Sequence, residues 1–164
     1  QDSAHRLEKP LNYKNAAVQE YAQGCTMVFN RFAKQLITSY MPQGDIAHDK
    51  WVGLLCYYFG DVFYLKEPLI YHIQYGSNAS AAGDVSLGQK KRLNAFKRAN
   101  AYDNVAADLL NGFGNMLQHK SFFCNLRDSK KIKNRLKLFF DPQFKRASIK
   151  GTLMLKLSAL MGKI

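Results

Sequence analysis

Four short segments in the first half of the chain carry side chains that could take part in chemistry. They read Gly24-Cys25-Thr26-Met27-Val28-Phe29-Asn30-Arg31, His48-Asp49-Lys50-Trp51, Gly60-Asp61-Val62-Phe63-Tyr64-Leu65 and His72-Ile73-Gln74-Tyr75-Gly76-Ser77-Asn78. The second segment places an imidazole beside a carboxylate, and both groups can exchange protons with a reacting hydroxyl. A lone His-Asp pair at a helix start is usually a cap, so any functional meaning depends on the four segments together.

The elements that would position these segments are predicted from hydrophobic periodicity and from helix and turn signals. Residues 49–59 have apolar side chains at helical spacing, and Asp49 suits the exposed N–H groups at the start of that helix. A shorter helix is predicted over residues 30–39, ending before Met41-Pro42. Runs rich in β-branched and aromatic residues predict short strands at residues 22–29, 62–65 and 69–75.

The second half of the chain is predicted to be mostly helical. Helical spacing extends over residues 87–118, a more basic helix follows over residues 121–140, and Asp141-Pro142 ends it. A last amphipathic helix is predicted over residues 147–164, with these side chains along one face: Ile149, Leu153, Leu157, Leu160 and Ile164. We therefore expect an α/β fragment, with strands and helices in residues 1–83 and a helical basic extension in residues 84–164.

In their order and spacing, the four segments resemble the acceptor-side half of family 2 glycosyltransferases with the GT-A fold. The resemblance is closest to bacterial enzymes that build lipopolysaccharide and other surface polysaccharides. In that family a Gly-x-x-x-x-Phe-Asn-Arg strand precedes an acidic-Asp or His-Asp pair and a Trp, and a Tyr-Arg-x-His-x-x-Asn loop follows an apolar helix and a strand pair. The resemblance covers about residues 17–80 and implies that residues 1–83 are the acceptor-side portion of a GT-A domain.

The resemblance assigns a role to each matching residue. Asp49 corresponds to the catalytic base, which takes the proton of an acceptor hydroxyl during an inverting displacement. His48, Trp51 and Asp45 fall on the acceptor side, where His48 would orient Asp49 or contact the acceptor and Trp51 would line a sugar ring. From the residues alone, Trp51 suits a core position at least as well, and Asp45 suits a loop cap.

The last segment departs from the family pattern. His72, Gln74, Tyr75 and Asn78 fall on the loop that faces the donor diphosphate, but Ile73 and Tyr75 stand where the family commonly has Arg and His. An isoleucine cannot pair with phosphate, and a tyrosine is a poor metal ligand at neutral pH. Three alternatives follow. The contacts to the diphosphate come from elsewhere, or His72 provides them after a one-residue shift, or the way the donor is bound is altered.

The donor-binding half of the family is missing from this sequence. In the family an Asp-x-Asp motif holds a divalent cation, Mg or Mn, that neutralises the leaving diphosphate. No Asp-x-Asp and no Gly-rich phosphate loop after a strand occurs in the 164 residues, so no metal site is expected in this chain. The resemblance implies a C-terminal part of a longer enzyme, inactive alone, whose parent uses a nucleotide-sugar donor and a lipid-linked glycan acceptor.

Positive charge is concentrated in the second half of the chain. The net charge is +12, yet residues 1–82 hold seven basic and seven acidic side chains, whereas residues 120–164 hold twelve and two. Basic groups interleaved with phenylalanines predict that residues 120–164 bind an anionic membrane surface. A nucleic acid is the competing anionic partner, but no nucleic-acid-binding motif is present.

Location and assembly follow from weaker signals. Three cysteines without a CxxC pair predict free thiols in a reducing compartment, and no apolar run reaches the roughly 18 residues of a membrane span. With no signal peptide at the start, we expect a cytoplasmic protein, peripheral on the inner face of the cytoplasmic membrane. Exposed apolar edges in a fragment would also favour a homodimer.

Overall fold

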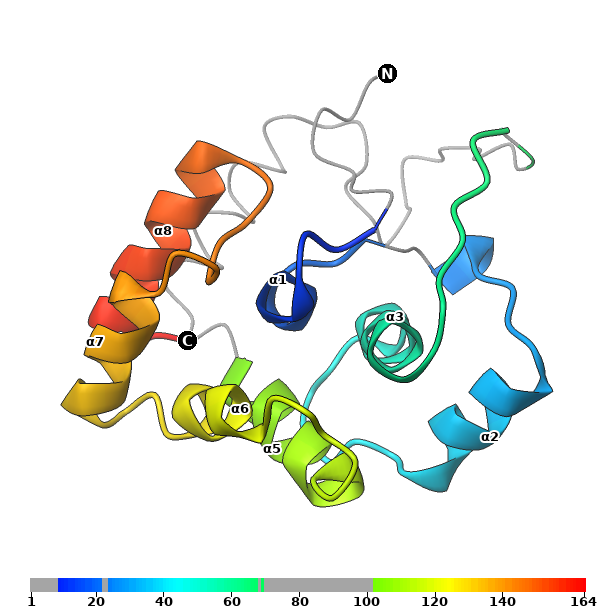
Figure 1. Ribbon diagram of the computed structural model, residues 1–164, viewed down its shortest axis with the longest axis horizontal. Coiled ribbons are helices and arrows are strands. Elements are labelled where there is room, and N and C mark those ends of the chain that lie inside the picture. The colour runs from blue at the N-terminus through cyan, green and yellow to red at the C-terminus, as the bar shows by residue number, and fades with distance from the viewer. Residues whose placement is uncertain (1–8, 22–23, 68, 70–101) are drawn as a thin grey trace, which may run out of the picture.

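The computed structural model describes residues 9–21, 24–67, 69 and 102–164, and these residues form helices joined by irregular segments. The elements are α1 (Tyr13–Val18), the 3-10 helix η1 (Gly24–Thr26), α2 (Arg31–Ser39), α3 (His48–Phe59), α5 (Tyr102–Phe113), α6 (Lys120–Arg127), α7 (Ile132–Phe140) and α8 (Ile149–Leu160). Figure 1 shows α1 and α3 in the middle, α5 and α6 along one side, and α2 and the α7–α8 pair at opposite ends.

The predicted α/β fragment is wrong for the described part of the chain, which contains no strand. Of the predicted strand at residues 22–29, residues 24–26 form η1 and residues 27–29 are irregular, as are residues 62–65. Val28 is fully exposed and Phe63 is 88% exposed. A strand needs a neighbouring strand for its backbone hydrogen bonds, and no described segment supplies one. The predicted strand at residues 69–75 lies outside the described residues except for Leu69.

Helices with clear local signals form where the sequence predicts them. The Asn30 side chain accepts a hydrogen bond from the Ala33 N–H at 2.9 Å and starts α2. The helix predicted over residues 49–59 is α3, which begins at His48 and ends before Gly60. The last predicted helix is shorter than expected: it starts as α8 after Ser148, whose Oγ accepts from the Gly151 N–H.

The single helix predicted over residues 121–140 is instead two helices, α6 and α7. Asp128 follows α6 and forms ion pairs with Arg127 and Lys131, and hydrogen bonds from these two side chains lower the pKa of Asp128 to about 2. The carbonyl groups freed by the break are also satisfied, because Asn134 donates to the Asp128 carbonyl and Arg135 to those of Ser129 and Lys130. These side-chain bonds make the interruption stable.

One hydrophobic core joins helices from both halves of the chain. Its fully buried members include Leu55 from α3, Leu109 from α5 and Phe123 from α6. The loop between α7 and α8 is held on α1 by two hydrogen bonds. The Asn15 side chain donates to the Lys145 carbonyl, and the Arg146 side chain donates to the Val18 carbonyl. Trp51, one of the predicted acceptor-side residues, packs in this core against Phe113 of α5.

Candidate active site

Asp49, the predicted base, lies in the first turn of α3. Its side chain is half-buried, and Oδ1 accepts a hydrogen bond from the Lys50 N–H at 2.9 Å. No ion pair joins Asp49 to another described residue. The helix N-terminus stabilises the negative charge, and the carboxylate is not neutralised by a described cation.

His48 and Asp45 lie beside Asp49 in sequence and are both exposed. His48 is the first residue of α3 and contacts Gly24, where an added Cβ would overlap the imidazole Nε2. The first and second sequence motifs, which are 24 positions apart, are therefore in contact. Asp45, His48 and Asp49 together form what we call the α3 entry site.

Trp51 lies in the core rather than at an open surface. It is 3% exposed and contacts the rings of Tyr40 and Phe113, with centroids 6.2 and 6.3 Å away. Its Nε1 has no hydrogen-bond partner in the described part of the chain. Of the two roles that the sequence allows for Trp51, its position fits the core role, and no face of the indole is open to a sugar ring.

Asp108, on α5, is a buried carboxylate that the sequence reasoning missed. It accepts three hydrogen bonds: from the Tyr40 hydroxyl at 2.8 Å, the Gln43 N–H at 2.9 Å and the Gly44 N–H at 2.9 Å. It is 3% exposed. Because all three donors precede α3 by a few residues, Asp108 holds the segment that leads into the α3 entry site.

Gly112 completes the attachment of this segment to α5. It lies one turn after Asp108, and an added Cβ would stand 2.5 Å from Cγ of Tyr40, so the phenol ring packs where a side chain would be. Burial, and then the hydrogen bond to Asp108, raise the pKa of Tyr40. The sequence signal for this attachment was an acidic residue, Asp108, four positions before a glycine, Gly112, within an apolar helical pattern. The sequence did not indicate their partners, which are more than 60 residues away.

Lys50 follows Asp49 and lies near the Tyr102 ring together with a second cation, Arg146. The Lys50 Nζ lies over the Tyr102 ring, 4.4 Å from its centroid, and the Arg146 guanidinium lies 6.0 Å from the same centroid and also bonds the Tyr102 hydroxyl. Burial lowers the pKa of Lys50 to about 8, while Glu20 raises it and Arg146 lowers it. At neutral pH the fold therefore carries a partly buried ammonium at a free-energy cost.

Lys50→Met is expected to raise the free energy of unfolding at pH 7 by about 1–3 kcal/mol, because a shift of one pKa unit corresponds to about 1.4 kcal/mol and the contact with Tyr102 offsets part of the cost. The pKa of Lys50 is lower in the folded than in the unfolded state, so the wild type gains stability as the pH rises from about 8 to 10.5.

The stability advantage of Lys50→Met over the wild type should therefore shrink by more than half at pH 9.5. Urea unfolding at both pH values measures this, with Lys34→Met on the exposed surface of α2 as control. Equal effects of the two substitutions would contradict the prediction.

The remaining predicted site residues cannot be placed. His72, Ile73, Gln74, Tyr75 and Asn78 lie outside the described residues. Among the residues that the structure describes, no three His, Cys, Asp or Glu side chains come together as a metal site.

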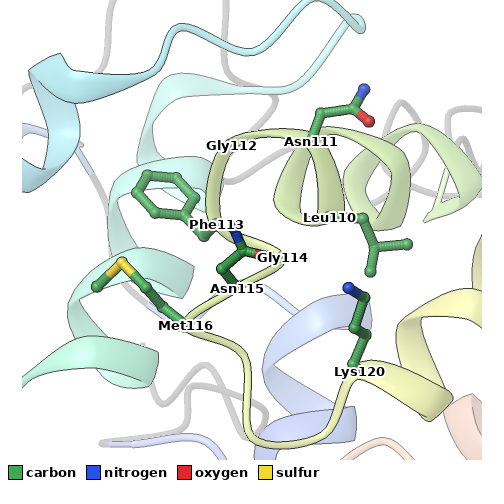
Figure 2. Close-up of a pocket in the computed structure, with 8 residues that line it drawn as sticks. All are labelled: Leu110, Asn111, Gly112, Phe113, Gly114, Asn115, Met116 and Lys120. Atoms are coloured by element: carbon green, nitrogen blue, oxygen red, sulfur yellow. The ribbon is translucent and has the colours of Figure 1, made fainter.

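A hollow of about 300 Å³ lies at the C-terminal end of α5 (Figure 2). It is lined by residues 110–116 and by Lys120, whose side chain reaches toward Leu110. The hollow is open and contains no residue of the α3 entry site. We assign it no role in the chemistry.

Comparisons with known proteins add no relative. No family model, no curated protein and no solved structure matches the chain. Within the described ranges, no helix has the length and apolar character needed to cross a membrane. The family resemblance therefore rests on the four sequence segments.

Proposed function

We propose that the chain is the acceptor-side part of an inverting glycosyltransferase that transfers a sugar from a nucleotide-sugar donor to a cell-surface polysaccharide or lipopolysaccharide acceptor. The observation that supports this most is the α3 entry site: Asp45 and His48 are exposed, Asp49 is half-buried, and His48 contacts Gly24 of the first segment. His48, Asp49 and Gly24 belong to two of the four segments on which the resemblance rests. In the family the first of these segments is a strand, whereas here residues 24–26 form η1 and residues 27–29 are irregular.

In this mechanism the acceptor hydroxyl oxygen attacks the anomeric carbon while Asp49 accepts the hydroxyl proton. The bond from that carbon to the nucleotide diphosphate breaks, and the diphosphate leaves on the opposite face, which inverts the configuration. Among the described residues Asp49 accepts one side-chain hydrogen bond, from the Lys50 N–H, and this leaves lone pairs of the carboxylate for the proton. In this mechanism His48 contacts the acceptor. Asp108 takes no part in the chemistry and holds the segment before α3 through its bonds from Gln43 and Gly44.

The function is tested by assaying transfer directly. A polypeptide containing these residues and a donor-binding part, supplied with UDP- or dTDP-sugars and a lipid-linked acceptor, should form a product of inverted anomeric configuration, read by the proton coupling constant at the anomeric carbon. Residues 1–164 alone should give no turnover. Retention of configuration, turnover by the isolated chain, or no transfer from any nucleotide sugar would overturn the proposal.

The second candidate function is a non-catalytic module that binds an anionic partner. It is favoured by one observation, the exposed basic and apolar side chains of α7 and α8. A transfer product separates the two candidates, since only the first requires one. The anionic partner of this module would be a membrane or a nucleic acid, and only a membrane partner would place it, like the first candidate, on the inner face of the cytoplasmic membrane.

A further inference from the structure

The α7–α8 pair turns its large apolar side chains in two directions. Leu138, Leu155 and Ala159 are buried against the core. A second set points outward, and we call it the α7–α8 face: Ile132, Leu136 and Phe140 on α7, and Ile149, Leu153 and Leu157 on α8. In each helix the outward residues are four positions apart, so each helix presents one continuous apolar row.

The most exposed members lie where the two helices are joined. Phe140 is the last residue of α7 and is 73% exposed, and Ile149 is the first residue of α8 and is 91% exposed. The loop between them is held on α1 by Asn15 and by Arg146, which donates to the Val18 carbonyl. This anchoring keeps the two side chains outside the core, and exposed apolar rows on paired helices are typical of an interaction surface.

Positive charge surrounds this face. Residues 130–150 hold eight basic side chains and one acidic one. Lys133, Lys137, Lys145 and Lys150 are exposed, and none forms an ion pair with a described residue. The surface therefore combines unneutralised ammonium groups with bare aliphatic and aromatic groups.

We infer that the α7–α8 face docks on an anionic lipid bilayer, with Phe140 and Ile149 inserted at the level of the headgroups and the lysines against lipid phosphates. A bilayer fits both features, because its interface accepts apolar side chains and its surface attracts basic ones. A nucleic acid would match the charge but leave the apolar rows in water. A second copy of the chain would cover the rows but bring two surfaces of the same sign together.

This inference deepens the proposed function and takes its biological meaning from it, because docking at the bilayer would bring the chain to a lipid-linked acceptor. Its test needs no turnover, so it can fail while the transfer proposal stands. The whole chain is mixed with vesicles of phosphatidylcholine alone or with about one third phosphatidylglycerol, at 0.1 M and 0.5 M salt, and bound protein is measured by co-sedimentation. We expect binding to the anionic vesicles at low salt and much weaker binding in the other three conditions.

Two variants separate the apolar contribution from the electrostatic one. Phe140→Ser combined with Ile149→Ser should weaken binding to anionic vesicles about tenfold or more. Lys133→Gln combined with Lys137→Gln should also weaken it about tenfold or more, and should reduce its dependence on salt. The matched control is Phe63→Ser, which removes a phenylalanine that is 88% exposed outside the α7–α8 face and should leave binding unchanged. All substituted side chains are exposed, so circular dichroism should show unchanged helix content.

Several outcomes would overturn the inference. Equal binding to neutral and anionic vesicles would remove the electrostatic part, and full binding by the Phe140→Ser, Ile149→Ser variant would remove the apolar part. An equal loss of vesicle binding by the Phe63→Ser variant would show that the binding is not specific to the α7–α8 face. Tight binding to a duplex DNA oligonucleotide that survives the serine substitutions, or a dimer in sedimentation that those substitutions dissociate, would assign the surface to another partner.

Discussion

Asp49→Asn is expected to lower turnover of the complete enzyme by about 10³-fold with little change in its stability, within the range that general base catalysis supplies. An amide has nearly the shape of a carboxylate but cannot accept the proton of the acceptor hydroxyl. Its oxygen can still accept the hydrogen bond from the Lys50 N–H, so the start of α3 is preserved. The loss should fall on kcat rather than on KM.

Two neighbouring carboxylates are matched controls for Asp49. Asp45→Asn removes a charge in the same α3 entry site and should raise KM more than it lowers kcat, as expected for a group that contacts only the acceptor. Asp61→Asn, on an exposed residue after α3, should have no effect. If Asp49→Asn keeps near-normal turnover, or if Asp61→Asn is as damaging, then Asp49 is not the base.

Asp108→Ala is expected to lower the free energy of unfolding by about 3–5 kcal/mol. The substitution leaves three hydrogen-bond donors without the buried carboxylate that accepts from all of them. Asp108→Asn should cost less, because its amide oxygen can still accept from two of these donors. Urea unfolding of purified protein measures both values. Asp103→Ala is the matched control. The Asp103 carboxylate lies in the first turn of the same helix and is less buried, and within the described residues it bonds only the adjacent Asn104 N–H.

The hydrogen bond between Tyr40 and Asp108 can be isolated with a double-mutant cycle. Tyr40→Phe removes only the hydroxyl that donates to Asp108, so its effect on stability should largely vanish when Asp108 is already alanine. Additive effects of the two substitutions, or a loss with Asp108→Ala no greater than with Asp103→Ala, would show that Asp108 does not hold the segment before α3. Turnover should also fall in Asp108→Asn, through the position of the α3 entry site.

Part of the candidate site could be predicted from the sequence because its signals are local. A carboxylate at the start of an apolar, helically spaced run predicts a helix beginning near Asp49, and α3 begins at His48. The contact between Gly24 and His48 and the bonds from Gln43 and Gly44 to Asp108 join distant positions. A single sequence, considered without an alignment, contains no signal for such pairs. The burial of Trp51 was likewise one of two open alternatives until its neighbours were known.

The strand predictions failed for a related reason. β-branched and aromatic runs suit a pleated surface, but a strand also requires a partner strand from elsewhere in the chain. In the described residues the run that includes Val28 and the run that includes Phe63 have no such partner and stay irregular and exposed. Local composition contains no information about whether the partner exists.

The last helix separates what the sequence determines from what the tertiary structure decides. The sequence alone determined that α8 is a helix and that Ile149, Leu153 and Leu157 share one face, because spacing along a helix is set by its geometry of 3.6 residues per turn. Only the tertiary structure decided that this face points outward while Leu155 and Ala159 meet the core. The choice depends on how α7 and the loop held on α1 orient the helix, and those contacts come from residues far away in the chain.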